Sequence, residues 1–234
     1  ARLHRLQGPA DKWTVVLPSY NGARRLPLMT PLLAQLLARE GLAVVVHGCA
    51  TESTRVTSEQ VFAAMGVNAF SAPRPVKAGE AVFVPTEVLL PGLKRLLDVR
   101  RVVNLRNPAH SLVKLMNPCQ GSALIVSSYT HPEYALSMAQ TFQLTQANAF
   151  LLRGTEGEPV ADARRAPQMD FFQNGSTQTV QAAQAGALQN IPDLPAANAE
   201  STAQYIQEIL NQQRAVPAPI ALQVQHILQA LKSL

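Results

Sequence analysis

The sequence predicts an α/β protein in which a mainly parallel central sheet is flanked by helices. Short, mainly apolar segments rich in Val, Leu and Ala alternate with segments of helical pattern along the chain. Apolar residues make up 47% of the 234 residues, which is ample for a packed core. Each apolar segment also ends in a polar or Gly/Pro-containing loop. This alternation is typical of βαβ units, whose doubly covered strands are continuous apolar runs.

Five strands are expected. The first is Trp13–Leu17, which the loop Pro18–Gly22 ends, and the second is Leu42–Val46, which ends at His47-Gly48. The other three are expected at Ala81–Val84, Ala123–Ser127 and Ala149–Leu152. Ligands of parallel sheets bind beyond the carboxyl ends of the strands. In this chain those ends are expected at residues 19–25, 47–55 and 127–131.

Helix signals lie between and after the strands. Thr30 followed by Pro31 is typical of an N-cap and a first helical position, and a leucine stripe continues this helix to Glu40. Thr57 and Gln60 form a capping-box pattern that begins a helix through Met65. Further helices are expected at 88–97, with a flaw at Pro91-Gly92, and at 132–146, 201–213 and 217–233. The Gln-, Ala-, Asn- and Gly-rich segment 172–200 is expected to be irregular.

Charge is distributed unevenly along the chain. Residues 1–118 hold 15 Lys/Arg and 7 Asp/Glu, a net of +8, whereas residues 119–234 have a net of −3. The asymmetry fits a one-sided surface for a polyanion, and it also fits cations that only keep the protein soluble. No apolar run approaches the roughly 18 residues of a membrane span. Cys49 and Cys119 lack CxxC spacing, which favours a reduced cytoplasmic protein without a structural zinc site.

Basic residues concentrate where the strand ends are expected to meet. Six of them fall within 21 residues against a single acid, Asp98, and three more follow the loops of the first two strands. We name these nine residues the basic rim: Arg24, Arg25, Arg55, Lys94, Arg95, Arg100, Arg101, Arg106 and Lys114. Each one alone fits a solvated or ion-paired surface residue. Together they favour contacts to phosphate groups, which attract such a surface regardless of base sequence.

Other residue patterns carry weaker functional signals. Glu133 follows His131-Pro132 in the first turn of an expected helix, where the helix dipole favours an acid without any catalytic role. Tyr20, in the first strand-end loop, is a candidate for stacking on a base, whereas Phe83 is expected in the core. No helix-turn-helix, zinc-finger or RNP pattern is present, so nothing supports sequence-specific reading of bases.

Several strings resemble the anthranilate phosphoribosyltransferases, a family of the glycosyltransferase family 3 and nucleoside phosphorylase type. Leu105–Pro118 is similar to their Arg-Thr-x-Phe-Asn-Leu-Leu-Gly-Pro-Leu-x-Asn-Pro segment, and His47-Gly48 to their Lys-His-Gly-Asn-Arg. Pro18–Arg24, His131–Tyr134 and Gly154–Glu158 are closer to a divergent, DNA-binding branch of this family. The resemblance covers most of residues 13–215. It implies the family's catalytic-domain fold and, for the branch, DNA binding.

The chain departs from the enzyme pattern at three places. Where the family cradles pyrophosphate in Gly-Thr-Gly-Gly-Asp, this chain has Pro18–Gly22 with a single glycine, and Val46 replaces the lysine before His-Gly. The magnesium-binding acids fall on Pro159 and Val160, which cannot ligate a cation, although Glu158 stands one place early. The resemblance therefore implies no catalytic residue, no metal ligand and no cofactor. Residues left for a relic phosphate pocket are Ser19, Asn21, Gly22, His47, Gly48 and His110.

Family members combine this domain with a small N-terminal helical domain and form head-to-head dimers through it. The resemblance implies that residues 1–12 are a remnant of that helical region or a linker, with the rest of it missing here. Residues 13–215 are then the phosphoribosyltransferase-like α/β domain, and 216–234 a C-terminal helix that packs on it. The full-length protein is expected to be a homodimer.

These observations predict sequence-independent binding of DNA, single-stranded DNA or RNA by the basic rim of a catalytically degenerate scaffold. The alternative is a phosphoribosyl- or glycosyltransferase with an altered pyrophosphate site, the only case in which magnesium is expected. A third reading, a chain kept for assembly with another protein, has no positive feature in the sequence. We expect a cytoplasmic protein with nucleic acid as its partner and no contact with a membrane.

Overall fold

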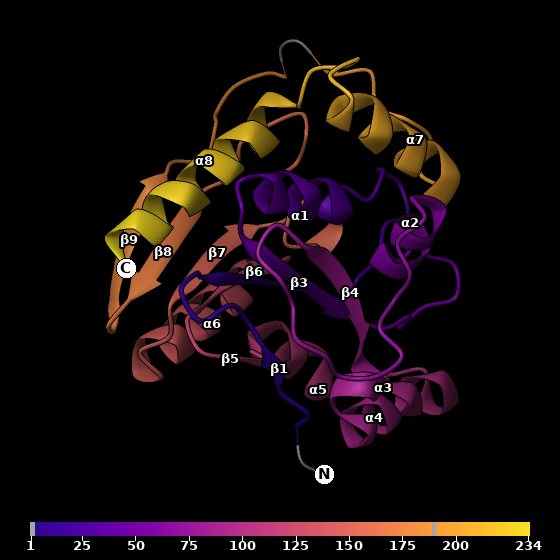
Figure 1. Cartoon of the computed structure of the whole chain (residues 1–234), viewed down its shortest axis with the longest axis vertical. Coiled ribbons are helices and arrows are strands. Elements are labelled where there is room, and N and C mark those ends of the chain that lie inside the picture. The colour runs from indigo at the N-terminus through magenta and orange to yellow at the C-terminus, as the bar shows by residue number, and fades with distance from the viewer. Residues whose placement is uncertain (1–2, 189–190) are drawn as a thin grey trace.

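The computed structural model describes residues 3–188 and 191–234 and has the α/β architecture that the sequence predicts (Figure 1). One sheet has the order β4-β3-β2-β6-β7-β8-β9. Its parallel strands are β2 (Thr14–Ser19), β3 (Ala43–Gly48), β4 (Ala81–Pro85), β6 (Ala123–Tyr129) and β7 (Ala149–Arg153). All five expected strands are therefore confirmed, each within one or two residues at its ends. The fold class is the predicted one, a mostly parallel sheet flanked by helices.

Helices cover both faces of the sheet, which is why its five parallel strands are buried along almost their whole length. Figure 1 shows α1 (Thr30–Arg39), α2 (Ser58–Ala64), α7 (Ala199–Leu210) and α8 (Ala218–Ser233) above the sheet. Below it lie α3 (Thr86–Leu89), α4 (Pro91–Val103), α5 (Ala109–Leu112) and α6 (Pro132–Leu144). Along β2, Val15 and Leu17 join the core of the first group, and Val16 joins the core on the other face. The alternation of neighbouring residues between two cores explains the unbroken apolar run.

The helix signals have mixed outcomes. The capping box of α2 is confirmed, because Thr57 Oγ1 accepts from the Gln60 backbone N–H and the Gln60 side chain accepts from the Thr57 N–H at 2.9 Å. The expected N-cap at Thr30 is wrong, since Thr30 is already the first residue of α1 and its hydroxyl donates to Glu158. The Pro91-Gly92 flaw is a real break: α3 ends at Leu89, Leu90 lies outside both helices, and α4 begins at Pro91.

The segment predicted to be irregular holds part of a β-hairpin instead. β8 (Met169–Gln173) pairs antiparallel with β7 and with β9 (Ser176–Gln181). The turn is Asn174-Gly175, both at positive φ, which is the favoured chemistry of a two-residue hairpin turn. Phe172 of β8 is buried, so the hairpin extends the core even though β9 is largely exposed. The irregular structure was predicted from the polar composition of the segment, whereas the Asn174-Gly175 pair is the local signal that indicates a hairpin.

Smaller elements complete the described part of the chain. β1 (Leu6–Gln7) pairs with β5 (Cys119–Gln120) in a separate parallel pair, and 3₁₀ turns lie at η1 (Val113–Leu115) and η2 (Thr155–Gly157). Residues 1 and 2 of the predicted remnant 1–12, and 189–190 of the segment 172–200, lie outside the described residues. No helix within the described ranges has both the length and the apolar character that crossing a bilayer requires.

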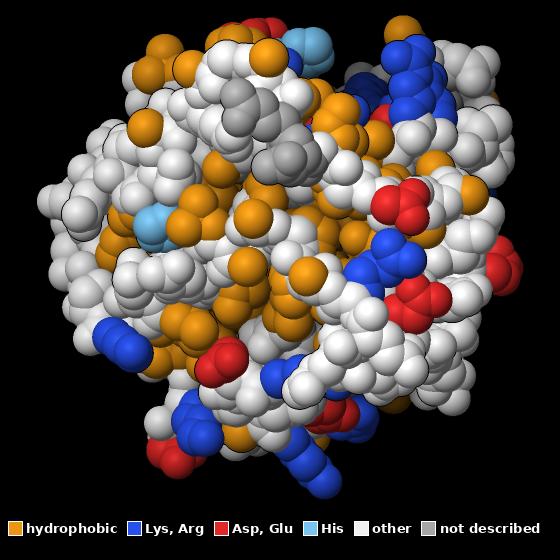
Figure 2. Space-filling model, turned by 90° about the horizontal axis from the view of Figure 1, so that it is seen from above, with side chains coloured by type: hydrophobic (Ala, Val, Ile, Leu, Met, Phe, Trp, Pro, Cys, Tyr) orange, Lys and Arg blue, Asp and Glu red, His pale blue; other side chains and the backbone are white. Residues whose placement is uncertain are grey.

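Figure 2 looks onto the layer of α1, α7 and α8. Hydrophobic atoms surface in its middle, and the Lys and Arg side chains around them are scattered, several beside Asp or Glu. The C-terminal helix packs through Ile220 and Ile227 into the same core as Leu32 and Leu33 of α1. The helices of this layer therefore cover the core on one face of the sheet.

Candidate functional site

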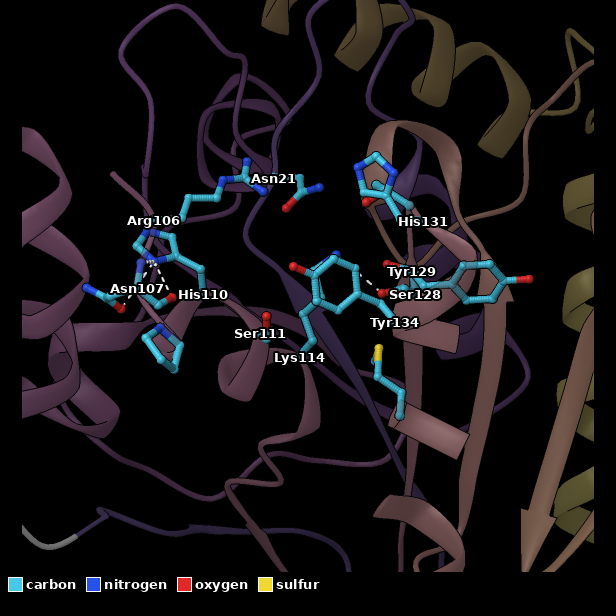
Figure 3. Close-up of a pocket in the computed structure, with 13 residues that line it drawn as sticks. Asn21, Arg106, Asn107, His110, Ser111, Lys114, Ser128, Tyr129, His131 and Tyr134 are labelled. Carbon is cyan, nitrogen blue, oxygen red and sulfur yellow. Dashed lines mark hydrogen bonds between the residues drawn. The ribbon is translucent and has the colours of Figure 1, made fainter. Parts of the chain in front are cut away.

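A pocket of about 500 Å³ opens at the carboxyl edge of the sheet (Figure 3). It lies where parallel sheets bind their ligands. One wall comes from Asn21 after β2 and from the segment between α4 and η1, and the other from the end of β6 and the start of α6. The lining residues are Asn21, Arg106, Asn107, Pro108, His110, Ser111, Lys114, Ser128, Tyr129, Thr130, His131, Tyr134 and Met138. In Figure 3, Arg106 and His110 face His131 and Tyr134 across the opening, with Lys114 between them.

The predicted relic phosphate pocket is only partly at this cavity. Asn21 and His110 line it, whereas Ser19, Gly22, His47 and Gly48 do not. His110 uses Nδ1 within its own turn, near the Asn107 carbonyl oxygen at 3.2 Å, and its Nε2 is buried without a hydrogen-bond partner in the described chain. Burial lowers the pKa of His110, the hydrogen bond with the Asn107 carbonyl opposes this shift, and the Arg100 and Arg106 charges add smaller lowering effects. Phosphate binding by the six residues stays a prediction.

The backbone of the loop after β2 is bound by a buried carboxylate. Glu158 has no exposed surface, and its Oε1 accepts the N–H groups of Asn21 and Gly22 at 2.7 Å each. Its Oε2 accepts the hydroxyls of Ser19 and, at 3.3 Å, of Thr30 in the first turn of α1. Four donors thus satisfy one carboxylate, which is what a buried charge needs. In this structure Glu158 therefore binds the loop after β2, and the metal-binding role that the sequence allowed for it stays a prediction.

A second glutamate binds the next stretch of the same loop. The Glu156 carboxylate accepts the backbone N–H groups of Arg24, Arg25 and Leu26, at 2.8, 3.1 and 3.3 Å to Oε2. Glu156 itself has φ of 50°, a left-handed conformation that is unusual for a residue with a side chain. Three hydrogen bonds to one carboxylate stabilise this conformation.

Two glycines let the Gly154–Glu158 turn come this close. A Cβ atom on Gly154 would lie 1.7 Å from the Glu158 carbonyl oxygen. Gly157 has φ of +85°, and a Cβ there would lie 1.9 Å from Asn21 Nδ2. Only glycine fits at these two positions, so the Gly-x-x-Gly-Glu spacing directly determines where Glu158 sits.

Lys114 is the cation of this buried region. Its side chain is 8% exposed, and Nζ donates to the carbonyl oxygens of Gly157 at 2.9 Å and Ser128 at 3.2 Å. Burial lowers the Lys114 pKa to about 8, although the nearby Glu158 charge opposes the shift. Lys114 was predicted for the basic rim, but the structure places it at the floor of the pocket.

His47 and Tyr20 form a buried pair behind the loop. The Tyr20 hydroxyl and His47 Nδ1 are 2.8 Å apart, and Nε2 donates to the Met116 carbonyl at 3.2 Å. Burial lowers the pKa of His47 to about 3, so the ring is neutral at pH 7. Tyr20 is 3% exposed, and the expectation that it could stack on a base is wrong, because no base can reach its ring. Phe83, expected in the core, is confirmed there.

Three arginines of the basic rim converge on Glu52. Arg55 Nε lies 3.0 Å, Arg100 2.6 Å and Arg106 3.4 Å from its carboxylate. Burial would raise the pKa of Glu52, but hydrogen bonds from Arg100 and Arg55 outweigh it and lower the pKa to about 2. The cluster links the loop after β3, α4 and the pocket, and three cations on one anion leave it positive.

The remaining residues of the basic rim differ in whether they form ion pairs. Asp98 pairs with Lys94 at 2.5 Å and lies 3.6 Å from Arg101 Nε. Arg24, Arg25 and Arg95 are exposed and make no ion pair with any residue that the structure describes. The structure thus brings Arg55, Arg100 and Arg106 together and leaves three other arginines in solvent.

Sequence reasoning missed the acids that organise the site. Glu52 was overlooked because it lies 48 residues before Arg100, and no local pattern connects them. Glu158 was considered only as a metal ligand, and Glu156 was assigned no role. Within residues 3–188 and 191–234, no three His, Cys, Asp or Glu side chains gather as a metal site would require. The expectations on cofactors and metals remain predictions.

Comparison with known proteins places this arrangement in context. No protein-family model matches the chain. It is 37% identical over 227 residues to the uncharacterized protein YbiB of Escherichia coli (strain K12), an alignment covering 94% of this chain and 70% of YbiB. It is 28% identical over 152 residues to anthranilate phosphoribosyltransferase of Synechococcus sp. (strain JA-3-3Ab), covering 63% of this chain but only 44% of that enzyme.

Solved structures show the same fold. The anthranilate phosphoribosyltransferase TrpD of Thermus thermophilus superposes with a TM-score of 0.68 at 21% identity, over 99% of this chain and 71% of that one. The Saccharomyces cerevisiae enzyme in complex with PRPP and Mg gives 0.67 at 10% identity, over 99% and 68%. At these identities the likeness establishes the fold alone. Through its similarity to YbiB, the chain belongs to the YbiB family, whose scaffold is that of the anthranilate phosphoribosyltransferases.

Proposed function

We propose that this protein binds nucleic acids without regard to base sequence, through phosphate contacts at the carboxyl edge of its sheet. The observation that carries the proposal is the group of arginines at this edge, in which the Glu52 cluster of Arg55, Arg100 and Arg106 is flanked by exposed arginines. The cluster is held in place and remains cationic. Such a surface attracts a phosphate backbone by charge and by release of its counterions.

The geometry supports phosphate contacts by some rim residues more than by others. Arg106 is 48% exposed and reaches the pocket, so its guanidinium can contact an incoming phosphate while it still touches Glu52. Arg24, Arg25 and Arg95 add exposed charge without an ion-paired partner among the described residues. Arginine is suited to this role because its planar fork can make two parallel hydrogen bonds to a phosphate. Lys114 is buried at the floor of the pocket, so the sugar-phosphate backbone of a nucleic acid cannot reach it.

The test is fluorescence-anisotropy binding of a labelled random oligonucleotide, single- and double-stranded. R24A/R25A/R95A removes three free rim charges, and R39A/K77A/K232A removes three exposed charges elsewhere as the matched control. At moderate salt we expect the rim variant to bind at least tenfold more weakly and the control to bind within about twofold of the wild type. If both variants lost the same affinity, binding would depend on the overall positive charge of the protein, and the proposal that the basic rim is the binding surface would be refuted.

A second candidate function is transfer of a phosphoribosyl or glycosyl group with an altered pyrophosphate site. The pocket of about 500 Å³ at the carboxyl edge is the feature in its favour. Its test is magnesium-dependent binding of phosphoribosyl pyrophosphate by calorimetry. We expect no binding, because Glu158 already takes the loop donors that a diphosphate would need. Saturable, magnesium-dependent binding would favour the transferase over the nucleic-acid proposal.

A further inference from the structure

The loop from Ser19 to Leu26 has the construction of an anion site. Of its backbone N–H groups, those of Asn21 and Gly22 point at one carboxylate, and those of Arg24, Arg25 and Leu26 at another. The intervening Ala23 N–H pairs with the Val56 carbonyl oxygen at 2.8 Å, which holds the curved backbone in place. Successive N–H groups on a curved backbone form a concavity that binds anions.

The deeper half of this loop has the additional donors that a tetrahedral oxyanion requires. The hydroxyls of Ser19 and Thr30 point at the same carboxylate as the two N–H groups, and both residues are buried. The Lys114 ammonium lies in the same buried region, close enough for its charge to interact with Glu158. Two backbone amides and two hydroxyls form a donor set suited to a phosphate group, and the Lys114 ammonium, which donates to the neighbouring Gly157 carbonyl, adds positive charge nearby.

We infer that Glu158 is a built-in substitute for phosphate, which occupies this anion site and closes it to free anions. The Glu158 side chain has no exposed surface, and the turn that carries it is fixed by Gly154 and Gly157, whose positions admit no Cβ. A ligand tethered in its bound position binds in an intramolecular step, so a free anion must displace it to enter the site. The inference concerns the loop alone and does not depend on nucleic-acid binding by the rim.

The inference predicts that deleting the carboxylate opens the site. E158A removes the substitute anion and leaves its donors unpaired, so inorganic phosphate has a place to bind. E158Q is the matched control, because the amide fills the same space and its oxygen can still accept from the Asn21 and Gly22 N–H groups. Both variants and the wild type are compared by thermal unfolding in sodium phosphate and in sodium chloride of equal ionic strength, and by equilibrium dialysis of labelled phosphate.

We expect E158A to bind one phosphate per chain and to gain about 4 °C in Tm at tenfold its Kd. The wild type and E158Q should bind none and show no difference between the two salts. If E158A folds only when phosphate is present, that result supports the inference as well. A folded E158A without a phosphate response, an E158A that stays unfolded with phosphate, or a wild type that responds as strongly would overturn it.

Discussion

At the residue scale, His47 and Tyr20 show how burial removes a side chain from the chemistry that its sequence position suggests. His47 follows a buried strand and would be a natural phosphate ligand, yet it is fully buried and bonded to Tyr20 and to the Met116 carbonyl. A buried imidazole with one donor and one acceptor satisfied is held neutral. Its contribution is therefore to stability.

The depressed pKa of His47 makes stability depend on pH. In the unfolded chain His47 takes up a proton below about pH 6.5, whereas the folded protein does not until pH falls to about 3. Unfolding thus takes up a proton in this window, and the free energy of unfolding falls as the pH is lowered. Urea unfolding between pH 4 and 6 should show the wild type losing about 1.4 kcal/mol per pH unit more than H47L. Parallel curves for the two proteins would contradict this assignment.

Tyr134 is the exposed aromatic residue that can replace the buried Tyr20 as a stacking platform. It is 45% exposed at the edge of the pocket, and its ring centroid lies 6.2 Å from that of His131. Stacking on an aromatic ring requires an unpaired base. Y134A should therefore weaken single-stranded binding by roughly tenfold and leave duplex binding almost unchanged. The comparison uses anisotropy with matched single- and double-stranded probes, and equal losses on both would exclude stacking.

At the element scale, α4 is a helix that polar contacts hold in place. Leu97 is its one buried residue in the described structure, while Leu96, Val99 and Val102 are exposed. The ion pair between Arg100 and Glu52 ties the helix to the loop after β3. The αL conformation of Asn104 ends the helix and leads the chain toward Arg106 at the pocket.

This arrangement predicts the effect of neutralising Glu52. E52Q should destabilise the protein by roughly 1 kcal/mol, a modest value because the pairs are partly exposed and screened by solvent. Amide hydrogens of α4 should exchange faster with solvent, because the helix loses its anchor. Hydrogen exchange measured by mass spectrometry reports this, with E59Q in α2 as the control. Unchanged protection of α4 would show that Leu97 alone holds the helix.

At the scale of the whole molecule, the sequence predicts the framework better than the site. Apolar runs such as Leu42–Val46 locate the parallel strands because both faces of the sheet are covered, so the pattern is local. The hairpin β8–β9 was missed because its outer strand is polar and exposed. The convergence on Glu52 was missed because Arg100 and Arg106 lie 48 and 54 residues away, although Arg55 is only three residues away. The role of Glu158 was missed because Asn21 lies 137 residues away, and only the folded chain brings the two together.

The uneven charge of the sequence becomes an uneven surface in the fold. The net of +8 in residues 1–118 includes all nine rim residues. The structure refines this prediction, because Lys114 is buried and Lys94 is paired with Asp98. Five arginines remain with exposed side chains suited to phosphate contacts: Arg24, Arg25, Arg95, Arg101 and Arg106. The number of these arginines determines how strongly salt is expected to weaken nucleic-acid binding.

The most direct test of nucleic-acid binding is the salt dependence of the association constant of the wild-type protein for a random duplex. Each phosphate neutralised contributes about −0.9 to the slope of log K against log salt concentration. Five contacts predict a slope of about −4 to −5, whatever the base sequence of the probe. A slope near zero, or no binding at low salt, would contradict the proposal that this edge of the sheet binds nucleic acid.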